Sequence, residues 1–192
     1  MSGDDSRISL LRESVIAAPI VWKGDYAYFV HPLTDGVPRQ SAKLLATARD
    51  LIIEMVDWQN IDVILGVEAM GLPLAATLSV AVDKPLVIAR KRGYGFADEV
   101  MIDQSTGYSK GEIFLNDVQP SDRVVVIDDV ISTGGTMRAI LSTIERIGAT
   151  ISDVVIVFEK GVGMQRLIAD HGWPMHSLVR LEMDGDRVVL LD

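Results

Sequence analysis

The apolar residues of the chain follow two patterns, a helical periodicity and short uninterrupted runs. Over 41–58, and again over 137–147, apolar residues recur every three or four positions, which is the spacing of an amphipathic helix. Between such segments stand short uninterrupted apolar runs, typical of strands that are buried on both faces of a sheet. These patterns predict helices at 7–17, 41–58, 72–81, 137–147 and 163–171, and extended segments at 21–30, 62–67, 85–90, 113–115, 124–127, 154–159 and 178–183.

The order of these elements indicates the fold class. Strands and helices alternate over most of the chain, which predicts an α/β protein whose parallel sheet is flanked by helices on both faces. A length of 192 residues suits one domain with a modest subdomain, so we treat residues 1–192 as a single domain. Residues 92–111 have mixed charge and little apolar periodicity, and we expect a long mobile loop there, an arrangement that is often functional.

Composition narrows the classes of protein that fit. The net charge of −9 argues against a general nucleic-acid-binding surface, so we expect no nucleic-acid partner. The chain has no cysteine and therefore no disulfide, thiolate nucleophile or Cys-ligated metal. No stretch approaches the roughly 18 apolar residues of a membrane span, and the N-terminus is acidic and polar. We therefore expect a cytoplasmic protein with no membrane partner.

The segment 124–136 carries the most specific chemistry in the chain. A buried strand ends in Asp128 and Asp129, whose carboxylates can accept hydrogen bonds from a vicinal diol. The loop that follows precedes a helix, so its backbone N–H groups and hydroxyls can hold a phosphate dianion, and its glycines let the backbone approach closely. The residues of this loop are Ser132, Thr133, Gly134, Gly135 and Thr136. Ligands bind at this end of the strands in open α/β sheets.

This string resembles the phosphoribosyl-pyrophosphate (PRPP) motif of the type I phosphoribosyltransferases: an apolar run, two acidic residues, two apolar residues, a small residue and Thr-Gly-Gly-Thr. Segments 28–36, 67–71 and 107–109 are most similar to archaeal-type hypoxanthine/guanine phosphoribosyltransferases. The resemblance covers nearly the whole chain. It implies the type I phosphoribosyltransferase fold, with a small hood over the purine built from about 15–40 and 161–185.

The resemblance also implies roles for single residues. Asp128 and Asp129 would bind the ribose, and the loop after them the 5′-phosphate. The pyrophosphate would be held by a β–α loop and by cations at the end of the next strand, where arginine can bind an anion with two parallel N–H groups. These candidates are Glu68, Ala69, Met70, Gly71, Arg90 and Lys91.

Base recognition is the second set of implied roles. Lys160, with Val130, would contact the base, and a lysine at this place in relatives donates to the exocyclic oxygen of 6-oxopurines. Ser132 stands where many hypoxanthine-guanine enzymes place an aspartate base, so the proton acceptor is left open between Asp128, Asp129 and Glu99. Residues 94–111 resemble the loop that closes over the active site, where water must be excluded.

The function implied is purine salvage, in which 5-phosphoribosyl passes from PRPP to hypoxanthine or guanine and pyrophosphate is released. Mg²⁺ would come with PRPP, so we expect no protein metal site. Relatives are commonly homodimers. Two alternatives are an adenine phosphoribosyltransferase and a non-catalytic PRPP- or nucleotide-sensing regulator. The chain lacks the Gly-x-x-x-x-Gly-Lys-Ser/Thr string of an ATPase and the glycine spacing of a dinucleotide site.

Overall fold

The computed structural model describes residues 6–24, 26–105 and 110–191. The helices are α1 (Ser6–Ile16), α2 (Pro32–Asp35), α3 (Ala42–Met55), the 3₁₀ turn η1 (Trp58–Asn60), α4 (Gly71–Val82), α5 (Gly135–Ile147) and α6 (Gly163–His171). The strands are β1 (Ile20–Lys23), β2 (Tyr26–Phe29), β3 (Val63–Val67), β4 (Leu86–Ala89), β5 (Val100–Ser105), β6 (Lys110–Leu115), β7 (Arg123–Ile131), β8 (Thr150–Lys160), β9 (Met175–Asp184) and β10 (Arg187–Leu191).

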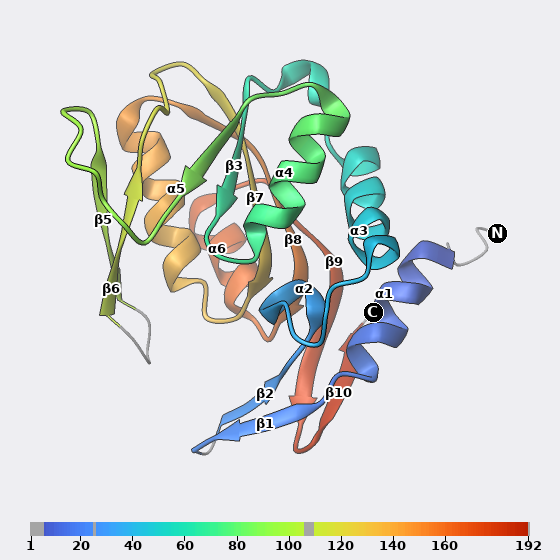
Figure 1. Cartoon of the computed structure of the whole chain (residues 1–192). Coiled ribbons are helices and arrows are strands. Elements are labelled where there is room, and N and C mark those ends of the chain that lie inside the picture. The colour runs from blue at the N-terminus through green and yellow to red at the C-terminus, as the bar shows by residue number, and fades with distance from the viewer. Residues whose placement is uncertain (1–5, 25, 106–109, 192) are drawn as a thin grey trace.

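The centre of the molecule is a six-stranded sheet in the order β10-β9-β8-β7-β3-β4 (Figure 1). Neighbouring strands from β9 to β4 are parallel, and only β10 is antiparallel to its neighbour. The predicted α/β class with a mainly parallel sheet is therefore confirmed. Parallel strands need crossover connections, and those connections are the helices that cover the sheet.

Helices cover both faces of this sheet, as Figure 1 shows. Successive side chains of a strand point to opposite faces, so Val125 and Ile127 of β7 join one hydrophobic cluster while Val124 and Val126 join the other. The first cluster is packed with α1, α3 and α4, and the second with α5 and α6. Strand β7 is thus buried from both sides over Val124, Val125, Val126 and Ile127, directly before the aspartates.

Two antiparallel hairpins are not part of the six-stranded sheet, although a β-bridge joins Phe114 of β6 to Arg90 directly after β4. One pairs β1 with β2, and the other pairs β5 with β6 (Figure 1). The expectation of a loop without regular structure over 92–111 is therefore wrong for 100–105 and for 110–111. Ile102 and Ile113, which are partners in β5–β6, are almost fully buried, whereas Met101 is half exposed. Among the described side chains of β5 only Ile102 is buried, which is too weak a pattern to predict a strand from sequence. In β6 both Ile113 and Leu115 are buried, and they lie in the predicted segment 113–115.

The other departures concern the ends of the sheet. The patterns predict no strand after 183, but β10 pairs with β9 and closes one edge. Of the two segments expected to form a hood, the first contains the β1–β2 hairpin. The second contains α6 and β9, and β9 is hydrogen-bonded to β8 in the central sheet. The division into body and hood stays a prediction.

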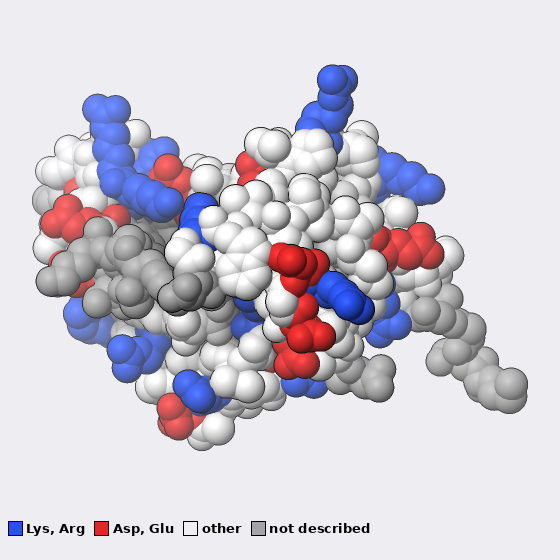
Figure 2. All heavy atoms as spheres, turned by 90° about the horizontal axis from the view of Figure 1, so that it is seen from below, with Lys and Arg blue, Asp and Glu red and all other residues white. Residues whose placement is uncertain are grey.

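The surface carries charges of both signs. On the face drawn in Figure 2, Lys and Arg side chains are interspersed with Asp and Glu side chains. Within the described ranges, no helix is both long and apolar enough to span a bilayer.

Candidate active site

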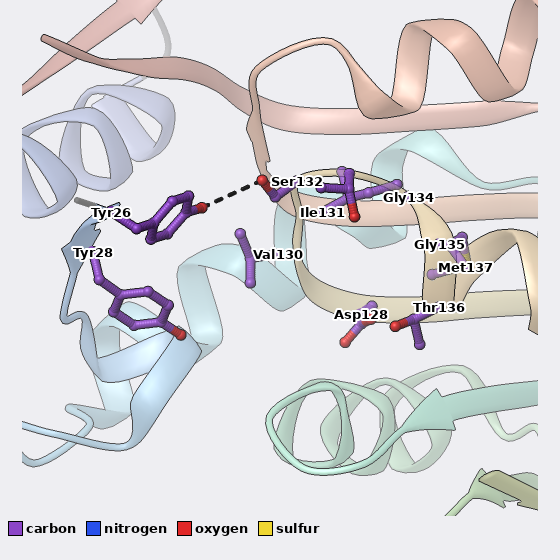
Figure 3. A pocket seen from close by; sticks show the side chains of 11 residues that line it. Tyr26, Tyr28, Asp128, Val130, Ile131, Ser132, Gly134, Gly135, Thr136 and Met137 are labelled. Carbon is purple, nitrogen blue, oxygen red and sulfur yellow. Dashed lines mark hydrogen bonds between the residues drawn. The ribbon is translucent and has the colours of Figure 1, made fainter. Parts of the chain in front are cut away.

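A cavity of about 390 Å³ opens at the carboxyl end of β7 (Figure 3). The end of β7, the loop after it and the start of α5 form one wall, and two tyrosines of β2 stand opposite. Its lining residues are Tyr26, Tyr28, Asp128, Val130, Ile131, Ser132, Thr133, Gly134, Gly135, Thr136 and Met137. The structure therefore brings together Asp128, Val130 and the whole predicted phosphate-binding loop.

The loop is shaped by two close contacts with α6. Gly134 has φ +79°, a left-handed conformation that glycine adopts without strain, and a Cβ there would lie 2.9 Å from Leu167. A Cβ on Gly163 would overlap the carbonyl oxygen of Ser132 and lie 2.7 Å from the carbonyl carbon of Thr133. Helix α5 begins without a side-chain cap, so its first-turn N–H groups can serve an anion.

The two aspartates occupy different environments. Asp128 lines the cavity, and its carboxylate accepts the backbone N–H of Asp129 at 2.9 Å. The side chain of Asp129 is only 8% exposed, and it is not among the residues that line the cavity. Burial raises the pKa of both carboxyls, and the neighbouring Asp128 raises that of Asp129 further. The pair therefore retains a proton at neutral pH more readily than two exposed aspartates would.

Lys160 lies at the end of β8 and reaches across to the β1–β2 hairpin. Its ammonium donates to the hydroxyl of Tyr26 at 2.7 Å and to the carbonyl of Ala27 at 2.9 Å. It also helps to line a second cavity of about 60 Å³, with Tyr26, Tyr28, Phe29, Thr34, Val130 and Ser132. Four of these residues line both cavities, so Lys160 stands beside the phosphate-binding loop.

Tyr26 connects Lys160 to that loop, because its hydroxyl lies 3.4 Å from Ser132 Oγ (Figure 3). Partial burial acts to raise the pKa of Tyr26, but the hydrogen bonds with Lys160 and Ser132 and the charge of Lys160 bring it below its ordinary value. Lys23 Nζ lies over the ring of Tyr28, 4.8 Å from its centroid, but burial and the nearby Asp35 and Asp129 raise the pKa of Tyr28 to about 12. The two phenols are therefore chemically different.

The candidate pyrophosphate loop lies directly beside Asp128. A Cβ on Gly71 would come within 2.7 Å of the carbonyl oxygen of Ile127 and 3.2 Å of Asp128 Cα, so only glycine allows this approach. The backbone N–H of Lys91 donates to the Glu68 carboxylate at 2.7 Å, which joins the two predicted pyrophosphate segments. The peptide bond between Glu68 and Ala69 is cis.

Arg90 and Glu99 do not contribute to the cavity at β7. Arg90 donates to the Tyr94 hydroxyl at 2.8 Å and lines a separate cavity beside β4. The Glu99 carboxylate accepts from the Asn116 side chain and from the backbone N–H groups of Tyr94 and Gly95, and these bonds lower its pKa. Neither residue lines the cavity at β7. Within the predicted closing loop 94–111, residues 106–109, and with them the segment 107–109, lie outside the described residues.

The pairing of Tyr26 with Lys160 was missed from the sequence. Residues two apart in a strand share a face, so the Tyr-x-Tyr alternation of β2 places both tyrosines on the side that faces the cavity. That alternation is the signal that could have identified them. The contact with Lys160 joins residues 134 positions apart, and no local pattern contains it.

Fold and site together define an α/β protein with a glycine- and hydroxyl-rich loop at the carboxyl end of a buried parallel strand. The model of the phosphoribosyl transferase domain matches residues 39–170. The chain belongs to this family, as the PRPP-like motif indicated.

Individual relatives are similar over nearly the full length. A hypoxanthine/guanine phosphoribosyltransferase of Ferroglobus placidus is 47% identical over 185 residues, covering 96% of this chain and 98% of that protein. One of Aciduliprofundum boonei is 43% identical, covering 96% and 100%. Among solved structures, the adenine phosphoribosyltransferase of Rhodothermus marinus has a TM-score of 0.75 at 24% identity, covering 93% of this chain and 100% of that one. At this identity the structural likeness shows the fold alone.

Proposed function

We propose that the protein transfers 5-phosphoribosyl from PRPP to hypoxanthine or guanine, giving the nucleotide and pyrophosphate. The observation that carries this is the junction of two cavities. One is lined by Asp128 and the phosphate-binding loop, the other by Lys160, and they share Tyr26, Tyr28, Val130 and Ser132. The names of the relatives at 43–47% identity support the same substrates.

The loop from Ser132 to Thr136 would hold the 5′-phosphate with backbone N–H groups and hydroxyls at the start of α5. Asp128 would accept hydrogen bonds from the ribose hydroxyls, and Asp129, buried behind it, would hold its position and its protonation state. As the bond to pyrophosphate lengthens, the ribose gains positive charge. The acidic pair next to it would stabilise that charge, and the fixed loop would supply orientation.

The leaving pyrophosphate would lie at Glu68–Gly71 and the Lys91 ammonium, which the Lys91–Glu68 hydrogen bond keeps together. Oxygen ligands on PRPP and the exposed part of Asp128 suit a hard cation. Mg²⁺ bound with PRPP would neutralise the charge that develops on the departing pyrophosphate. Arg90 would need to leave Tyr94 to join this site, so we assign it no part here.

Lys160 would read the base. An ammonium has donors and no acceptor, so it matches the oxygen of a 6-oxopurine and is left unpaired by a 6-amino group. Val130, which lines both cavities, would pack against the base. For the proton that the purine loses, Asp128 is the carboxyl that the cavity exposes.

A product assay tests this function. The purified protein is supplied with PRPP and Mg²⁺ and, in turn, hypoxanthine, guanine, xanthine, adenine, uracil or orotate, at low and high salt. We expect nucleotide from hypoxanthine or guanine. Nucleotide from adenine alone would make it an adenine phosphoribosyltransferase, and PRPP binding without turnover of any base would indicate a regulator.

The assembly and location are part of the same proposal. We expect a homodimer in the cytoplasm, and sedimentation equilibrium should give twice the chain mass of 21.0 kDa. A monomer mass at assay concentration would remove the dimer from the proposal.

A further inference from the structure

Tyr26 makes two contacts with Lys160 and one with Ser132. Its hydroxyl accepts a hydrogen bond from Lys160 Nζ at 2.7 Å, and the same Nζ lies 3.9 Å from the centroid of its ring. The hydroxyl also lies 3.4 Å from Ser132 Oγ, on the phosphate-binding loop. Tyr26 lines both cavities of the site. The residue therefore stands between the lysine, the loop and the space that a base would fill.

The direction of these bonds is set by chemistry. An ammonium has three N–H donors and no acceptor, so Tyr26 and the Ala27 carbonyl both accept from Lys160. Two N–H groups are thereby fixed to β2, and tetrahedral geometry then fixes the direction of the third. A lysine side chain is long and flexible, and holding it in one conformation before the ligand arrives avoids the loss of that freedom during binding.

We infer that Tyr26 is a positioning residue for base recognition: its hydroxyl orients the Lys160 ammonium toward the exocyclic oxygen of a 6-oxopurine. This inference rests on the proposed function, in which Lys160 reads the base. We assign no such role to Tyr28, its neighbour on the same face of β2, since its hydroxyl interacts with Asp35, whereas the Lys160 ammonium donates to Tyr26.

The variant that isolates the hydroxyl is Tyr26→Phe, because it keeps the ring and the contact of the ring with the ammonium. It removes one charge-assisted hydrogen bond, so we expect the KM for hypoxanthine or guanine to rise about 10- to 100-fold. The KM for PRPP should rise by less than the base KM, because at the loop the variant loses only the longer contact of 3.4 Å with Ser132 Oγ. Trp22→Phe is the matched control, since Trp22 is an exposed aromatic residue of the same hairpin, paired with Ala27.

A double-mutant cycle separates positioning from a general effect on the fold. Kinetics are measured for the unsubstituted protein, Tyr26→Phe, Lys160→Met and the double variant, with the better of the two bases. If Tyr26 acts through Lys160, adding Tyr26→Phe to Lys160→Met changes kcat/KM by less than about twofold. An unchanged base KM in Tyr26→Phe would overturn the inference, as would a full loss in the Lys160→Met background or a parallel rise in the PRPP KM.

Failure of the proposed function would look different. In that case the unsubstituted protein itself would form no nucleotide from hypoxanthine or guanine. Undiminished turnover in Lys160→Met would instead remove the role of Lys160, and the inference about Tyr26 would fall with it while transferase activity remained.

Discussion

Asp129 is only 8% exposed and lies beside a second carboxyl, that of Asp128. A charge buried in this way destabilises the native state. Because its pKa is raised in the folded protein, the native state binds more protons than the unfolded state above about pH 4. The free energy of unfolding therefore falls as pH rises through the folded-state pKa.

Asp129→Asn removes this titration. We expect the variant to be more stable than the unsubstituted protein at pH 7–8, by on the order of 1–3 kcal/mol, with the difference shrinking toward pH 4. Turnover should nevertheless collapse in Asp129→Asn combined with Asp128→Asn. Urea unfolding at several pH values measures the first effect and the product assay the second. Lower stability of Asp129→Asn at pH 8, or near-normal turnover of the double variant, would contradict this reading of the pair.

His31 titrates in the opposite sense. Its side chain is fully buried, Nδ1 accepts from the Leu33 N–H to cap α2, and Nε2 lies 3.0 Å from Ser14 Oγ. Burial lowers its pKa to about 4, with Asp35 opposing the shift. Between about pH 6.5 and 4 the unfolded state binds more protons, so stability contributed by neutral His31 is lost as pH falls.

We expect His31→Asn to flatten the pH dependence of the unfolding free energy in this window by on the order of 1–3 kcal/mol, while the asparagine oxygen can still cap α2. Because the aspartate pair titrates in an overlapping range, the test is the difference between variant and unsubstituted protein at each pH. A difference that does not change between pH 7 and pH 4.5 would show that His31 is not the titrating group.

At the scale of elements, the phosphate-binding loop depends on how closely α6 approaches it. Gly163 begins α6, and a Cβ there would overlap the Ser132 carbonyl oxygen. Gly163→Ala must therefore displace either the loop or the helix. We expect a loss of about 1–3 kcal/mol in stability, typical of overpacking, and a rise of at least about tenfold in the KM for PRPP.

Arg166→Ala is the matched control for this prediction, because Arg166 lies on the exposed side of the same helix. It should change both quantities little. Thermal unfolding and the PRPP dependence of the rate give the two measurements. A Gly163→Ala protein with normal PRPP affinity would mean that the loop is positioned independently of α6.

At the scale of the whole molecule, ligand binding should be visible as stability. A ligand that binds only the folded chain at 100 times its Kd adds about 2.7 kcal/mol. At about 2–4 °C per kcal/mol for a protein of this length, the Tm should rise by about 5–11 °C. We expect this shift with PRPP and Mg²⁺, and a smaller one when EDTA removes the metal. Asp128→Asn combined with Asp129→Asn serves as the control and should show little shift. An equal shift in this control would place PRPP elsewhere.

The elements of the sheet could be predicted because their signals are local. The segment 124–136 contains its whole signature within 13 residues: an apolar run, Asp128 and Asp129 near the carboxyl end of β7, and glycines after the strand. The segment 113–115 of β6 could be predicted, but β5 could not, because Ile102 is buried only where it meets Ile113 and α5. The same holds for β10, which is a strand only because β9 lies beside it.

By itself, the sequence determined the alternation of strands and helices, the family, and the glycine- and hydroxyl-rich loop at the end of β7, since each depends on residues close together in the chain. Only the tertiary structure decided which candidates meet. It placed Asp128 in the cavity and buried Asp129, directed Glu99 and Arg90 elsewhere, and brought Tyr26 to Lys160. The physical reason is that these outcomes depend on packing between distant segments, which no local periodicity encodes.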